Sequence, residues 1–188
     1  MVVNYFGNGC FRLQSGDTSL VVNPTSNRFK ADAVLRTLLL TGEPVAPEEI
    51  SFPGEYEIKG IEIQGWPLKE ESTAKVVKSI FMVTWEETKF LFLGHLSKSL
   101  PAEILEEVGD PDLVFIPTGD DHFISPEDAA KLIKRLEPKI VIPAFYKNAN
   151  ALVKAMGRGS ENQEKFVFRR KDLGEEAKAK LIILESKS

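Results

Sequence analysis

The stretch that decides the fold is PKIVIPAFY, from Pro138 to Tyr146. Its first half is a short apolar run rich in β-branched residues, which is typical of a buried strand. The end of such a strand is where enzymes often carry a catalytic or metal-binding side chain. Phe145 stands at that place and can do neither. This strand end therefore either never had a chemical role or has lost the residue that carried one.

The residues before this stretch predict a parallel arrangement. Residues 125–138 predict a helix, because Ser125 can cap it, Pro126 takes the first helical position, and acidic residues precede basic ones. Residues 112–117 predict a buried strand, so strand, helix and strand together indicate a parallel crossover. Further helices are predicted over residues 102–109 and 149–157, and closing strands over residues 165–168 and 180–185.

The first half of the chain predicts a different organisation, in which short strands are joined by tight turns. Alternating apolar and polar residues over 54–66 predict a hairpin that turns at Lys59-Gly60, and residues 78–94 predict a second hairpin. Residues 31–40 fit either a strand or a helix. The remaining strands are predicted over residues 2–6, 10–14 and 19–23, and surface turns over residues 157–164 and 172–179.

These elements together predict an α/β sandwich of two mixed β-sheets with helices outside, in a single domain over residues 1–188. The hydrophobic share of 43% and the charged share of 28% are those of a globular protein. A net charge of -4 gives no electrostatic footprint for nucleic acid. The single cysteine, Cys10, excludes an internal disulfide and a cysteine zinc cage. We expect a cytoplasmic protein, since neither a secretory start nor a membrane-length apolar run is present.

Five motifs follow one another from about Val3 to Tyr146: GNGCF (7–11), Asn23-Pro24, PGEYEIKG (53–60), LGH (93–95) and PKIVIPAFY. In this order they resemble the metallo-β-lactamase-fold hydrolases, in particular the small branch typified by the bacterial L-ascorbate-6-phosphate lactonase. The resemblance implies a metallo-β-lactamase-like αββα sandwich. It also implies the chemistry of that family, in which one or two ions, usually zinc or manganese, lower the pKa of bound water to about 7.

This chain departs from the family pattern where the family binds metal. The family's histidine-rich loop has no counterpart, because residues 35–50 contain neither histidine nor aspartate. The resemblance places Asn8 and Phe145 where the family has histidines, and Asn23 and His95 where it has aspartates. On this basis we assign no catalytic residue, no metal ligand and no cofactor. We expect these four residues to cluster at one edge where the two sheets meet.

The loop at residues 118–123 adds two further candidates, Asp120 and His122, because the corresponding loop borders the pocket in the family. The alternative is a solvated turn that leads into the Ser125 cap. For His95 the alternative is an imidazole satisfied by backbone groups. The predicted ligand-binding residues are thus Asn8, Asn23, His95, Asp120, His122 and Phe145.

The sequence therefore favours a non-catalytic, metal-free relative of these hydrolases. Such a protein acts as a ligand-binding or protein-interaction module, with a small molecule or a protein as its partner and neither nucleic acid nor membrane. Self-association into a homo-oligomer is left open. The alternative is a hydrolase with an altered single-metal or metal-free site around His95. The number of residues able to hold a metal separates the two interpretations and favours the first.

Overall fold

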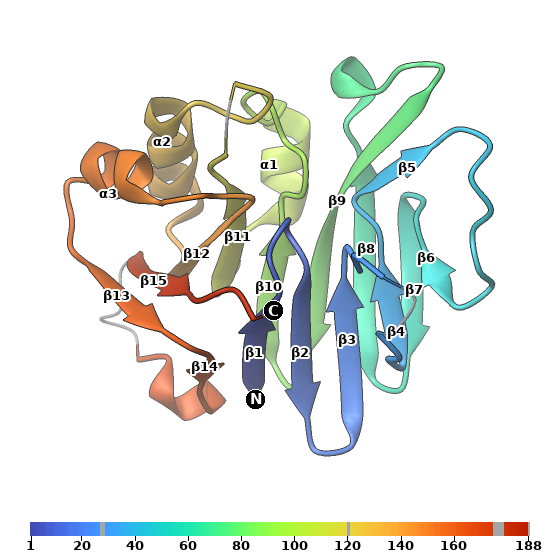
Figure 1. Cartoon of the computed structure of the whole chain (residues 1–188), viewed down its shortest axis with the longest axis horizontal. Helices are drawn as coiled ribbons and strands as arrows, with labels where there is room; N and C mark the ends of the chain where they lie inside the picture. The colour runs from blue at the N-terminus through green and yellow to red at the C-terminus, as the bar shows by residue number, and fades with distance from the viewer. Residues whose placement is uncertain (27–28, 120, 175–178, 188) are drawn as a thin grey trace.

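A computed structural model describes residues 1–26, 29–119, 121–174 and 179–187 and contains two mixed β-sheets packed face to face (Figure 1). The first sheet has the order β14-β1-β2-β3-β4-β6. Its strands are β1 (Val2–Tyr5), β2 (Phe11–Ser15), β3 (Thr18–Val22), β4 (Ala33–Leu35), β6 (Glu49–Ile50) and β14 (Phe166–Val167).

The second sheet has the order β13-β15-β12-β11-β10-β9-β8-β7, and β5 pairs with β9 beside this path. Its strands are β5 (Leu38–Leu40), β7 (Gly54–Ile58), β8 (Ile61–Pro67), β9 (Val76–Trp85), β10 (Thr88–Phe92), β11 (Leu113–Pro117), β12 (Ile140–Ala144), β13 (Ser160–Gln163) and β15 (Lys180–Leu184). The helices are α1 (Ala102–Val108), α2 (Pro126–Leu136) and α3 (Asn150–Met156), with short 3₁₀ turns η1 (Lys69–Glu71) and η2 (Arg170–Asp172).

The connections explain why both sheets are mixed. Short connections make β1, β2 and β3 antiparallel. β7, β8, β9 and β10 are antiparallel as well, with tight turns between β7 and β8 and between β9 and β10, and with η1 in the connection between β8 and β9. The longer connections that contain α1 and α2 make β10, β11 and β12 parallel. β15 then pairs in parallel with both β12 and β13. The carboxyl ends of β10, β11 and β12 consequently meet at one edge of the second sheet.

Two apolar clusters lie on opposite faces of the second sheet, as the alternation along β11 shows. Phe115 belongs to the cluster between the sheets, where its ring stacks on Phe92 at a centroid distance of 4.3 Å. Val114 and Ile116 belong to the cluster under the helices, with Leu132 of α2 and Leu152 of α3. The core between the sheets therefore ends in aromatic rings, directly beneath the strand ends.

The helix predicted over residues 125–138 is confirmed as α2, and the Ser125 hydroxyl oxygen accepts a hydrogen bond from the backbone N–H of Asp128 at 3.1 Å. The undecided residues 31–40 form two short strands, β4 and β5. The surface turn predicted over 157–164 is wrong, because residues 160–163 form β13. This edge strand is almost wholly exposed and polar, so it carries no apolar alternation from which to predict it. In the turn predicted over 172–179, residues 175–178 lie outside the described part.

No helix among the described residues is long and apolar enough to cross a membrane.

Candidate functional site

The site lies where the chain leaves β3 of the first sheet and β10 and β12 of the second. Asn23 directly follows β3, Phe145 directly follows β12, and Gly94 and His95 come just after β10. The φ angles of Asn23, Gly94 and Phe145 are +50°, +53° and +56°. A side chain in this left-handed region costs about 1–2 kcal/mol, and such strain gathers at functional sites. Phe145 is thus held in a costly conformation, whereas Asn23, at the same edge of the molecule, is a residue that tolerates a positive φ.

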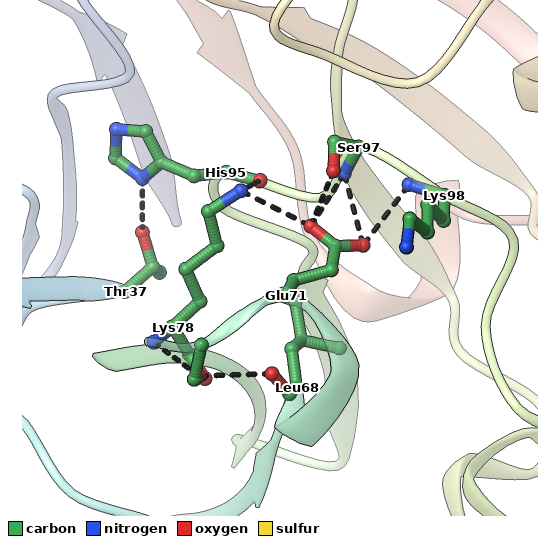
Figure 2. Close-up of polar contacts among 8 residues, drawn as sticks. Thr37, Leu68, Glu71, Lys78, His95, Ser97 and Lys98 are labelled. Carbon is green, nitrogen blue, oxygen red and sulfur yellow. Dashed lines mark hydrogen bonds and ion pairs between the residues drawn. The ribbon is translucent and has the colours of Figure 1, made fainter. Parts of the chain in front are cut away.

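A hydrogen-bonded chain links Asn23, Thr37 and His95. The Asn23 side-chain oxygen accepts from the Thr37 backbone N–H at 2.8 Å and from the Thr37 hydroxyl at 3.0 Å. The Thr37 hydroxyl has one proton, which this second bond uses, so its oxygen accepts from His95 Nδ1, 3.2 Å away (Figure 2). The proton of the neutral imidazole therefore sits on Nδ1. Nε2 keeps its lone pair and points away from Thr37.

His95 is neutral at physiological pH. Burial, and then the positive charge of Lys78, lower the pKa of His95 from 6.5 to about 4. Both causes disfavour the imidazolium, because burial removes water from a charge and Lys78 places a like charge nearby. The lone pair on Nε2 is consequently available above about pH 5. His95 can accept a proton or a hydrogen bond there, and it does so as a weak base.

Two phenylalanine rings cover His95. The Phe145 ring centroid lies 4.4 Å from that of His95, and Phe123 stacks on Phe145 at 4.9 Å. The same Phe145 ring fills the space over Gly9, where an added Cβ would lie 2.1 Å from the ring. Gly9 is therefore required at this position, and the aromatic pair closes the edge of the sandwich.

Phe145 provides a test of backbone strain at this edge. Phe145→Ala is expected to lower the free energy of unfolding by about 2–3 kcal/mol, below the usual cost for a fully buried ring because Phe145 is half-buried. Phe145→Gly should be more stable than Phe145→Ala by about 1 kcal/mol, since glycine adopts a positive φ without strain. Urea denaturation of both variants measures the difference. A glycine variant less stable than the alanine variant would contradict a strained Phe145.

Beneath the rings remains a cavity of about 10 Å³, the size of one water molecule. Among the described residues that line it, Asn23 alone has a polar side chain, and its oxygen already accepts two hydrogen bonds. Across the described part of the chain, no group of three or more His, Cys, Asp or Glu side chains could hold a metal ion. A zinc ion needs about three protein ligands, so the described donors do not fit one here.

The structure brings together three of the six predicted ligand-binding residues. Asn23 and Phe145 line the same cavity, and His95 contacts both Phe145 and Thr37. Asn8 precedes Gly9 but is exposed, and it lines a different hollow together with Tyr146. His122 is exposed in the loop after β11, and Asp120 lies outside the described residues.

The sequence did not indicate two neighbours of His95, namely Thr37 and Phe123. Thr37 lies inside an apolar run, where a single threonine gives no functional signal, although it is fully buried. Its proximity to His95 comes from the pairing of β5 with β9. Phe123 ends the 118–123 loop, in which the sequence indicated the polar residues Asp120 and His122 and not the phenylalanine. The role of such a buried threonine can be recognised only once the pairing of the strands around it is known.

Residues 2–144 match the family described as the beta-lactamase superfamily domain. The chain belongs to the beta-lactamase superfamily. A crystal structure from Thermotoga maritima, assigned to the zinc-dependent hydrolases of the metallo-beta-lactamase superfamily, shares the fold with a TM-score of 0.81. It is 22% identical in sequence and covers 98% of this chain and 99% of that one. The expected metallo-β-lactamase-like fold of two mixed sheets with helices outside is confirmed.

Curated relatives match parts of the chain. A UPF0173 metal-dependent hydrolase of Methanopyrus kandleri is 27% identical over 107 residues, which are 53% of this chain and 46% of that protein. A UPF0173 metal-dependent hydrolase of Listeria monocytogenes is 32% identical over 63 residues, which are 34% of this chain and 28% of that protein. The matches thus span less than half the length of these relatives.

The predicted non-catalytic module is wrong in the light of these relatives, which are named metal-dependent hydrolases. The prediction rested on counting residues that could hold a metal. Such a count concerns only the activation of water by a metal ion. A side-chain base can also activate water, so the count does not exclude hydrolysis. The hydrogen-bonded chain from Asn23 through Thr37 orients His95 so that its Nε2 lone pair could serve as such a base.

Proposed function

We propose that this member of the superfamily is a hydrolase whose altered site is centred on His95 and works without a metal ion. The observation that carries the proposal is the chain from Asn23 through Thr37 to His95 Nδ1. It fixes the tautomer and the orientation of the ring, as the partner of a catalytic histidine does in other hydrolases. The metal ligands of the family are, in this proposal, replaced by Asn8, Asn23, His95 and Phe145.

The chemistry follows from the neutral imidazole. Nε2 takes a proton from a water molecule while the water oxygen attacks the carbonyl carbon of an ester. The bond from that carbon to the leaving oxygen then breaks, and the same proton passes from Nε2 to the leaving oxygen. No proton is gained or lost overall. Thr37 and Asn23 hold the ring in place throughout, because Nδ1 keeps its own proton.

The low pKa of His95 supports one class of substrate within this proposal. With a pKa of about 4, His95 is a weak base and its protonated form is a strong acid. A weak base activates water poorly, whereas a strong acid protonates a leaving group well. The site therefore suits a small, reactive carbonyl compound such as a strained lactone or an activated ester. The resemblance to the lactonase branch supports the same class.

The test is hydrolysis by metal-depleted protein. The chain is purified without a histidine tag, treated with a chelator, and assayed on a panel of aryl esters and lactones. We expect chelator-resistant turnover of at least one of them. His95→Gln should lower kcat/KM by about 100-fold or more, the range for loss of a general base. Thr37→Val should lower it by about 10-fold, since the ring loses its orienting acceptor.

The control variant is Lys131→Gln, on the exposed surface of α2, where full activity is expected. Two results would contradict the proposal. Activity that the chelator abolishes and zinc restores would place a metal in the site. Activity that His95→Gln leaves intact would move the chemistry elsewhere in the molecule.

A further inference from the structure

A buried carboxylate lies on the far side of the segment that carries His95. Glu71, at the end of η1, has a side chain that is 5% exposed. Its two oxygens accept hydrogen bonds from the Ser97 backbone N–H at 3.1 and 2.9 Å, and one accepts from the Lys98 backbone N–H at 3.0 Å. The Ser97 hydroxyl adds a fourth bond, at 2.7 Å. A carboxylate removed from water is stable only with such partners, so its place is closely determined.

Lys78 of β9 completes the arrangement. Its ammonium group lies 3.1 Å from a Glu71 oxygen and donates to the His95 backbone carbonyl at 2.9 Å. Figure 2 shows Glu71 and Lys78 side by side, both directed at the segment from His95 to Lys98. Lys78 is itself 17% exposed, so the ion pair is largely shielded from solvent. The cation thus contacts the backbone of His95 and the anion that of Ser97 and Lys98, within one short segment.

The location of these contacts distinguishes them from an ordinary ion pair. Glu71 and Lys78 bind the backbone groups of His95, Ser97 and Lys98. The His95 ring is held from the other side by Thr37. The backbone and the ring are therefore fixed by separate parts of the chain, and both must be in place for the ring to meet Thr37. The Ser97 hydroxyl, which donates to Glu71, is engaged in this support and not with the imidazole.

We propose that Glu71 and Lys78 are positioning residues that clamp the His95–Lys98 segment and so hold the His95 ring against Thr37. The inference rests on the proposed function for its effect on turnover. It also makes a statement about the imidazole that needs no substrate. Loss of the clamp lets the segment shift, which breaks the bond from Nδ1 to Thr37 and frees the ring to exchange tautomers. A change of this kind, of about 1 Å, lowers kcat by about 100-fold in positioned active sites.

The experiment is nitrogen NMR of protein labelled at histidine, which contains two imidazoles, His95 and His122. In the wild type we expect His95 in the Nδ1–H form. Glu71→Gln removes the charge while keeping the shape, and its His95 signals should move toward a mixture of tautomers. Ser97→Ala removes one bond to Glu71 and should produce a smaller shift in the same direction. Lys78→Met should raise the pKa of His95, since the charge of Lys78 lowers it.

The matched control is Glu161→Gln, which makes the same chemical change in an exposed ion pair with Lys180 and should leave the His95 signals unchanged. On any ester that the wild type hydrolyses, Glu71→Gln should lower kcat by 10-fold or more with KM nearly constant, by the same positioning argument. Glu71→Asp, which restores the charge on a shorter side chain, should recover part of the loss.

The readouts separate this inference from the proposed function. If no ester is hydrolysed, the proposed function fails. The NMR signals of His95 still test whether Glu71 and Lys78 position its ring. If Glu71→Gln does not fold, the His95 signals of Ser97→Ala provide the test. Unchanged His95 signals in the folded variants, even with a lower melting temperature, would overturn the inference, because Glu71 would then support stability alone.

Discussion

Gly94→Ala is expected to lower the free energy of unfolding by about 3 kcal/mol, because two costs add at this position. Gly94 has a φ of +53°, which disfavours any side chain. The added Cβ would also lie 2.3 Å from the Cβ and 2.4 Å from the hydroxyl oxygen of Thr37. Thr37 is fully buried and bonded to Asn23, so it cannot move aside without breaking the chain that orients His95.

Gly16→Ala is the matched control. Gly16 has nearly the same φ, +54°, but an added Cβ would have no atom within 4 Å. This variant should lose about 1 kcal/mol, the conformational cost alone. Urea denaturation of both variants isolates the contact with Thr37 as the difference between them. Equal losses would mean that Gly94 and Thr37 do not pack as described.

His95 is expected to make the protein less stable as the pH falls from 6.5 toward 4. Its pKa is lowered from 6.5 to about 4 in the folded protein, so the unfolded chain binds the proton first. The contribution of His95 to stability is therefore fully present above pH 6.5 and is lost progressively down to about pH 4. The slope within this interval approaches about 1.4 kcal/mol per pH unit.

The measurement is the free energy of unfolding of the wild type and of His95→Asn at several pH values. Titration of the carboxylates is common to both proteins and cancels in the difference. The advantage of the wild type over the variant should shrink by about 2 kcal/mol between about pH 7 and about pH 4.5. A difference that stays constant with pH would show that His95 titrates normally and is not held neutral.

Most of the fold could be predicted from local patterns. α2 has a capping serine, a proline at its first position and opposite charges at its two ends, and all of these act within the helix itself. The hairpin of β7 and β8 is fixed by alternation on either side of one turn. β13 could not be predicted, because an exposed polar edge strand is defined by the backbone of its neighbour. Sequence patterns therefore predicted the elements whose stability depends on residues close together in the chain.

The candidate site divides in the same way. The family motifs indicated Asn8, Asn23, His95 and Phe145. Of these, Asn23 and Phe145 line one cavity, His95 contacts Phe145 and is linked to Asn23 through Thr37, and Asn8 lies apart. Thr37 and Glu71 could not be found, because they lie 58 and 26 residues from His95 and Ser97 and meet them only through strand pairing. Glu71 in particular stands in a charged stretch that is typical of a solvated turn. Its burial depends on which backbone groups the fold presents to it.

The position of β15 bears on how the chain folds as it is synthesised. β15 lies between β12 and β13, although both precede it in the sequence. A nascent chain that has not yet released Lys180–Leu184 leaves the facing edges of these two strands unpaired. Unpaired edges invite contact with other chains, and parallel pairing between distant segments is slow to form. A delay between the release of β13 and the release of β15 from the ribosome would therefore lengthen the period in which the new protein is most prone to aggregate.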